Sequence, residues 1–130
     1  MVAGCLKFLI NSIKAKKLAF GLIGYGGMPS NHSAIVSSTT ALIAFQEGIN
    51  TPAFGVALTL SFIVLLDANS LRQQVGKHAK AINELSQEIP KQTNLRERMG
   101  HTRIEILAGI LTGIVVAYLL SIISKIQVLV

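Results

Sequence analysis

Two histidines stand beside polar side chains at two distant points of the chain. His32 directly follows Ser30 and Asn31, and His101 lies four residues before Glu105. On a helix, a spacing of four residues puts two side chains on one face. A carboxylate at that position accepts a hydrogen bond from one imidazole nitrogen, fixes the tautomer and makes the other nitrogen a better nucleophile or base.

Each group also has a purely structural interpretation. The stretch 26–33 contains two glycines and a proline that end one element, and Ser30 or Asn31 is a good N-cap for the next helix. The free N–H groups and positive dipole end of such a helix suit an anion, although a plain turn and cap explains the same residues. Likewise, Thr102 and Glu105 have the spacing of a capping box, in which the glutamate closes the start of a helix.

A third polar group, at Asp67 and Arg72, follows a long apolar run. An ionisable residue near membrane depth is a functional candidate, so Asp67 is expected to support the site, although Asp67 and Asn69 could instead simply mark the membrane boundary. Two histidines among many cations point to phosphoryl transfer, in which one imidazole attacks phosphorus and the other protonates the leaving oxygen. The alternative is a metal site with His32, His101, Glu105 and Asp67 as donors. The surrounding cations disfavour that alternative, and we expect no metal and no cofactor.

The elements that must position these residues are apolar. The chain of 130 residues is 51% hydrophobic and only 14% charged, and its mean hydropathy is +0.57. This composition excludes a disordered chain, and a single cysteine excludes a disulfide scaffold. The stretches 48–66 and 106–124 are each 19 residues long and hold no charged side chain. About 20 apolar residues of helix cross a bilayer. We therefore predict an all-α, integral-membrane helical bundle that forms a single domain over residues 1–130.

The predicted bundle has about four membrane-embedded helices, at residues 2–16, 31–47, 52–71 and 102–125. Residues 48–52 are predicted to be a tight turn, because Gly and Asn tolerate positive φ and Pro52 suits a helix start. Residues 72–101 form a polar excursion. Within it, Ala79–Glu88 is predicted to be a short amphipathic helix, which Pro90 ends.

The cations gather at one end of this bundle. Ten of them fall on the side of residues 14–32 and 72–103, against Lys125 on the other. The positive-inside rule then places these loops in the cytoplasm, at the plasma membrane or, in a bacterium, the inner membrane. Some of the cations could instead bind phosphate, which would say nothing about orientation. The chain has no tryptophan and few aromatic residues, so we expect no nucleic-acid partner.

Small residues recur along the most apolar predicted helix. Gly109, Gly113 and Ala117 are spaced four apart, a pattern that lets helix backbones approach closely in lipid. We predict that this row lies at a helix–helix contact and supports a homo-oligomer.

Taken in order, four strings carry a family resemblance: GGMPSNHSA, DANSLR, GKHAKAINEL and GHTRIEILAGILTGI. Residues 28–33 resemble the Pro-Ser-Gly-His motif of the type 2 phosphatidic acid phosphatase superfamily, which includes the vanadium haloperoxidases. The ordered set, covering about residues 6–116, resembles the divergent small-membrane-protein branch of that superfamily.

The resemblance implies roles for the polar residues. His101 would be the nucleophile that forms a phosphohistidine, Glu105 would orient it, and His32 would protonate the leaving group. Ser30 would bind phosphate, with Asn31 standing where the superfamily usually has glycine. The superfamily's first cationic motif is absent, and the position six residues before His101 is a leucine. The cations left to bind phosphate are Lys7, Lys14, Arg72, Arg96 and Arg98.

These observations favour a membrane phosphatase acting on a lipid phosphate or a prenyl (di)phosphate. One alternative is a non-catalytic membrane protein that keeps a pocket for a phosphate or a lipid. Another is a small oligomeric transporter subunit.

Overall fold

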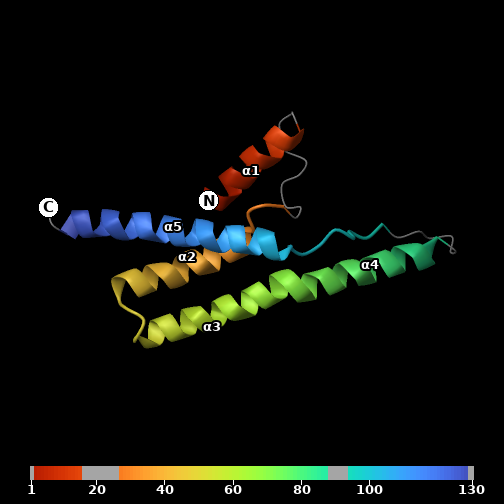
Figure 1. The fold of residues 1–130 in the computed structure, drawn as a ribbon. Helices are drawn as coiled ribbons and strands as arrows, with labels where there is room; N and C mark the ends of the chain where they lie inside the picture. Colours follow the sequence, from red (N-terminus) through yellow and green to blue (C-terminus); the bar gives the residue numbers. More distant parts are fainter. Residues whose placement is uncertain (1, 16–26, 88–93, 129–130) are drawn as a thin grey trace.

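The computed structural model describes residues 2–15, 27–87 and 94–128, and every regular element within these ranges is helical (Figure 1). The elements are α1 (Val2–Ala15), α2 (Asn31–Gln46), α3 (Pro52–Leu66), the π-helical turn η2 (Asp67–Leu71), α4 (Arg72–Ser86) and α5 (Arg103–Val128). The predicted all-α class is confirmed. Helices α1, α2 and α5 begin and end close to the predicted bounds, whereas the helix predicted at 52–71 begins at Pro52 but continues past residue 71.

The connection between α2 and α3 follows the local chemistry of its residues. Gly48 adopts a φ of +90°, a conformation that side-chain-bearing residues rarely take. Thr51 caps α3 by accepting a hydrogen bond from the backbone N–H of Phe54 at 3.3 Å, and Pro52 occupies the first turn. The tight turn predicted at residues 48–52 is confirmed.

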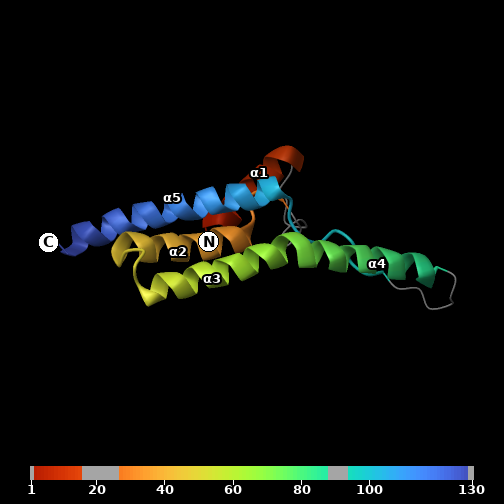
Figure 2. The ribbon, with the colours of Figure 1, turned by 60° about the horizontal axis from the view of Figure 1, so that its bottom comes forward.

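Residues 79–86 of the amphipathic helix predicted at Ala79–Glu88 are helical, but they form the end of α4 and not a short helix of their own. Helix α3 continues through η2 into α4, so that one helical rod runs from Pro52 to Ser86 (Figures 1 and 2). The change at Asp67 from apolar to polar residues alters the surroundings of the helix without ending it. The glutamines, lysines and alanines of α4 are good helix formers and sustain it. As a result, α4 projects beyond the other helices.

Helix α2 lies between α5 and α3 (Figures 1 and 2), and small residues allow its close approach to α5. A Cβ atom placed on Gly109 would lie 2.5 Å from the carbonyl oxygen of Ser30, and one on Gly113 would lie 2.5 Å from that of Ala34. Ala117 is fully buried in the same row. The predicted small-residue contact is thus made inside one chain, and the homo-oligomer stays a prediction.

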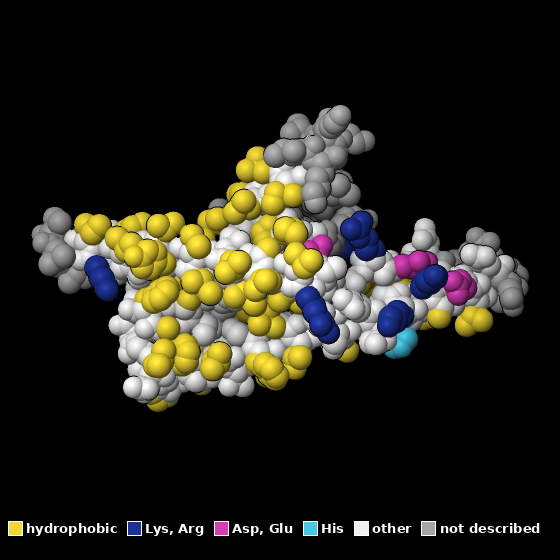
Figure 3. Space-filling model, in the orientation of Figure 1, with side chains coloured by type: hydrophobic (Ala, Val, Ile, Leu, Met, Phe, Trp, Pro, Cys, Tyr) yellow, Lys and Arg dark blue, Asp and Glu magenta, His cyan; other side chains and the backbone are white. Residues whose placement is uncertain are grey.

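The bundle is inverted relative to a water-soluble protein. Its buried side chains are mainly alanine and serine, whereas large apolar side chains of α3 and α5 such as Val56, Phe62 and Leu119 are exposed (Figure 3). Two helices, Pro52–Ser86 and Arg103–Gln127, are long and apolar enough to cross a membrane, and only 17% and 22% of their apolar windows are buried. Exposed apolar surfaces of this kind mark sites of contact with a membrane or another protein, and the length of the two helices makes them candidate membrane spans.

The lengths of α1 and α2 bear on the predicted count of four membrane spans. Helices α1 and α2 have 14 and 16 residues, or roughly 21 and 24 Å of helix. Both are shorter than the hydrocarbon core, which is about 30 Å thick. The count stays a prediction.

Candidate active site

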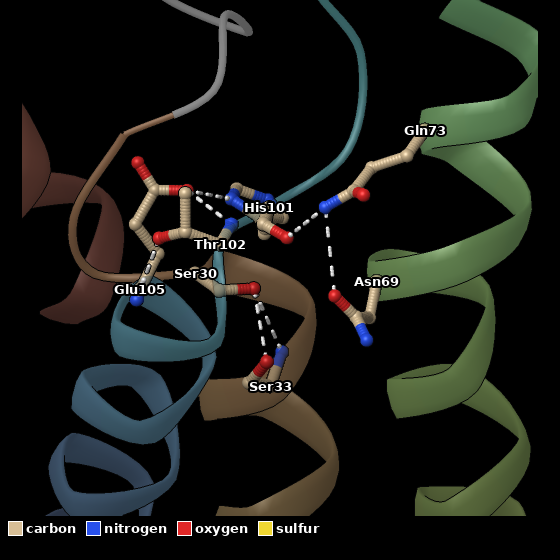
Figure 4. Close-up of polar contacts among 7 residues, drawn as sticks. All are labelled: Ser30, Ser33, Asn69, Gln73, His101, Thr102 and Glu105. Atoms are coloured by element: carbon tan, nitrogen blue, oxygen red, sulfur yellow. Dashed lines mark hydrogen bonds and ion pairs between the residues drawn. The ribbon is translucent and has the colours of Figure 1, made fainter.

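His101 lies at the end of the bundle, where residues 94–102 return along α4 and enter α5 (Figure 1). Its side chain is only 8% exposed. The Nδ1 atom lies 3.2 Å from Oε2 of Glu105, one turn into α5 (Figure 4). A carboxylate at Nδ1 favours the tautomer that carries the proton there, and this leaves Nε2 with its lone pair.

Glu105 also closes the start of α5. The same Oε2 atom accepts the backbone N–H of Thr102 at 3.0 Å, while the Thr102 hydroxyl accepts the backbone N–H of Glu105 at 3.3 Å. This is the reciprocal pattern of a capping box. One carboxylate oxygen of Glu105 therefore makes both contacts, the one that caps α5 and the one to His101.

The stretch around His32 forms the start of α2. Ser30 is the N-cap; its Oγ accepts from the backbone N–H of Ser33 at 3.4 Å and from the Ser33 hydroxyl at 2.9 Å. The backbone N–H of Ser30 donates to the carbonyl of Glu105 at 3.0 Å, which ties the start of α2 to the start of α5. Ser30 is also fully buried. These hydrogen bonds give Ser30 a structural role as the cap of α2. Oδ1 of neighbouring Asn31 is buried and has no hydrogen-bond partner among the described residues.

The structure brings the two histidines together from positions far apart in the chain. The ring centroids of His32 and His101 are 6.1 Å apart, and the rings are tilted by 59°. A nucleophile approaches phosphorus to about 3 Å, and a general acid lies about 3 Å from the oxygen that it protonates. The two rings are therefore close enough for both imidazoles to contact one small group such as a phosphoryl.

The cation set is dispersed. Arg72 forms an ion pair with Asp67 at 2.8 Å, so these two residues neutralise each other. Arg96 and Arg98 are exposed, and Leu95 beside them is held by the side chain of Asn83.

Asn83 lies ten residues beyond Gln73 along the same helix, which is about 15 Å. The predicted phosphate ligand Arg96 is therefore remote from the imidazoles. The side chains of Lys7 and Lys14 lie outside the described part of the structure.

The alternative to phosphoryl transfer was a metal site formed by His32, His101, Glu105 and Asp67. Within residues 2–15, 27–87 and 94–128, no group of three His, Cys, Asp or Glu side chains is arranged to hold a metal ion. Asp67 is engaged by Arg72, and His78 is exposed on α4.

One contact of the site has no signal in the sequence. The Nε2 group of Gln73, on α4, donates to the backbone carbonyl of His101 at 3.0 Å (Figure 4). Gln73 is one of several polar residues in a polar segment, and only the folded backbone distinguishes it.

Comparison with known proteins shows which family the chain resembles. A family model described as "Divergent PAP2 family" matches residues 1–116. A Bacillus subtilis (strain 168) protein named uncharacterized membrane protein YuiD is 32% identical over 136 aligned positions, which cover 92% of this chain and 86% of that protein. No solved structure matches the chain.

Proposed function

The chain belongs to the divergent PAP2 family of membrane proteins, and we propose that it is a metal-independent phosphatase of lipid phosphates or prenyl (di)phosphates. The observation that carries the proposal is the meeting of His32 and His101, at 6.1 Å, with Glu105 hydrogen-bonded to His101. A nucleophile, its orienting carboxylate and a second acid–base group within one phosphoryl span are the parts that covalent phosphoryl transfer requires.

In the proposed reaction, Nε2 of His101 attacks phosphorus and the bond from phosphorus to the leaving oxygen breaks. Protonated His32 gives its proton to that oxygen, which departs in the alcohol or, when the terminal phosphorus of a prenyl diphosphate is attacked, in the prenyl monophosphate. Glu105 balances the positive charge that develops on the imidazole of His101. Water, deprotonated by His32, then attacks the phosphohistidine and releases inorganic phosphate, and both histidines return to their starting states.

Two features support an amphiphilic substrate. The backbone of His101 is bonded to Ala68 and Gln73, at the junction of α3 and α4, and the apolar surface of the bundle gives way there to the charged projection of α4 (Figure 3). An apolar groove of about 460 Å³ runs between α2 and α3, from Ile35 and Leu60 toward Ile43 and Ala53. Ile35 is one helical turn from Asn31, so a chain leaving a phosphate at the start of α2 could lie in this groove.

We further propose that this end of the bundle faces the cytoplasm. Lysines and arginines of α4, of residues 94–98 and of the start of α5 gather there, and Lys125 lies at the far end (Figure 3). A Lys77→Cys variant in a Cys5→Ser background tests the orientation with a membrane-impermeant maleimide. Labelling only after the membrane is opened supports a cytoplasmic site, and labelling of intact cells contradicts it.

The proposed activity is tested by phosphate release from a panel of lipid phosphates and prenyl diphosphates, with purified protein, with and without EDTA. We expect release that EDTA leaves unchanged. His101→Ala should abolish nearly all of it, by several powers of ten. His78→Ala is the matched control, because His78 is exposed on α4 and should be dispensable. Loss of activity with EDTA would favour a metal mechanism instead.

A second candidate function is phosphate or lipid binding without catalysis. The apolar groove between α2 and α3 favours it, because the groove can hold a lipid chain whether or not a phosphoryl group is transferred. Binding of a lipid phosphate without phosphate release from any member of the panel would support this second function.

A further inference from the structure

The junction between α3 and α4 contains an unusual turn of backbone. In η2 the N–H of Arg72 donates to the carbonyl of Asp67, five residues back. In an α-helix that N–H would bond to the carbonyl of Ala68. The Ala68 carbonyl instead accepts the backbone N–H of His101 at 2.9 Å, and Ala68 is fully buried. Single π-helical turns of this kind are frequent at functional sites.

One helical turn further on, the same rod holds the other backbone group of His101. Nε2 of Gln73 donates to the His101 carbonyl at 3.0 Å and lies 3.5 Å from Oδ1 of Asn69 (Figure 4). Both the N–H and the C=O of His101 are therefore fixed by η2 and the first turn of α4.

Two glycines let the returning segment lie this close to the rod. Gly100 has a φ of +84°, and a Cβ atom there would lie 2.8 Å from Cγ and 3.0 Å from the backbone nitrogen of Gln73. At Gly76, a Cβ atom would collide with the backbone carbonyl oxygen of Glu97. Side chains at either position would lift residues 97–101 away from α4.

We propose that η2 and Gln73 form a backbone clamp that sets the position of the His101 imidazole, and that Gln73 is a positioning residue for phosphoryl transfer. This inference rests on the proposed function. His101 precedes α5, so the α5 helix does not hold its peptide groups, and Glu105 fixes only the ring. The clamp supplies the missing restraint. A misplacement of about 1 Å at a reacting group costs on the order of 100-fold in rate.

The test is Gln73→Met, which keeps the side-chain length and removes the donor. Gln74→Met is the matched control, because Gln74 is its exposed neighbour on α4. We expect kcat to fall by about 10- to 100-fold, with the KM for a lipid phosphate changed less than about twofold. The second readout is the ¹⁵N NMR spectrum of the His101 imidazole in nanodiscs, assigned by its loss in His101→Gln. In Gln73→Met we expect the signal of a single Nδ1–H tautomer to become a mixture.

The spectrum separates failure of the clamp from failure of the proposed function. A parent protein that releases no phosphate, but whose imidazole spectrum changes in Gln73→Met, supports the clamp and counts against the phosphatase. A spectrum unchanged from the parent overturns the clamp, whether or not the protein turns over.

A second variant guards against misfolding of the first. Gly76→Ala pushes on the clamp from the Glu97 side, and Gly55→Ala is its control because a Cβ atom at Gly55 meets nothing within 4 Å. The clamp predicts an altered His101 spectrum for Gly76→Ala alone. Identical spectra for both alanine variants would contradict it.

Discussion

Replacing Glu105 with glutamine separates the two roles that one carboxylate oxygen carries. Oε2 accepts from the backbone N–H of Thr102 at 3.0 Å and lies 3.2 Å from Nδ1 of His101. The amide oxygen of glutamine can accept the same hydrogen bonds, and glutamine serves in capping boxes. The substitution therefore keeps the cap and removes the negative charge.

The two effects differ in size. Loss of an acidic residue from the first turn of a helix costs about 0.3–1 kcal/mol, so the variant should melt within a few degrees of the parent. For catalysis, a unit charge pair 3.2 Å apart interacts by about 5 kcal/mol at an effective dielectric constant of about 20, and by about 1 kcal/mol in water. The side chains of His101 and Glu105 are 8% and 17% exposed. Turnover should thus fall by between about tenfold and a few thousandfold.

The assay pairs a thermal melt with phosphate release from a lipid phosphate. Glu84→Gln is the control, because Glu84 also has a partner four residues away, Lys80, at 3.8 Å, but both side chains are 64% exposed. This control should change neither quantity. A Glu105→Gln variant with the turnover and stability of the parent would refute the orienting role and leave Glu105 as a cap only.

Three further predictions concern the bundle. Gly109→Ala should lower the free energy of unfolding by about 1–3 kcal/mol in a denaturation assay, because its Cβ atom would press on the α2 backbone; Gly55→Ala, which points into open space, should not. Ala53→Trp should fill the far end of the α2–α3 groove and raise the KM of long-chain lipid phosphates, while short-chain substrates keep theirs. Thr40→Val should cost about 0.6–1.7 kcal/mol in the same denaturation assay, because the Thr40 hydroxyl bonds to α3 at 2.8 and 3.2 Å; Thr59→Val, whose hydroxyl bonds only within α3, is the control.

The helices were predictable because charge and capping residues mark their ends. The absence of charged residues from 48–66 and 106–124 defines the apolar parts of the long helices. The capping residues Thr51 with Pro52, and Thr102 with Glu105, fix where α3 and α5 begin. The spacing of His101 and Glu105 likewise predicted their contact, since both fall within one turn of helix.

The continuity of the long rod and the clamp on His101 could not be predicted in this way. Hydropathy changes sharply at Asp67, and from this change the sequence pattern predicted that the helix ends soon afterwards, at residue 71, whereas the helix continues through α4 to Ser86. The π-helical turn at Asp67–Leu71 has no compositional signal. Gln73 bonds to His101, which lies 28 residues later in the chain. A contact between residues so far apart cannot be predicted from the local sequence pattern.

The position of the candidate site follows from the needs of α5 as a helix in lipid. Backbone N–H groups at a helix start cannot be left without partners near the hydrocarbon layer, so α5 requires a cap at that boundary. The capping box of Thr102 and Glu105 meets this need. It also fixes the carboxylate beside His101, because the same oxygen serves both contacts. The cap that allows α5 to begin therefore holds the His101 imidazole at the border between the apolar and the charged parts of the protein, where a phosphate attached to a lipid chain would lie.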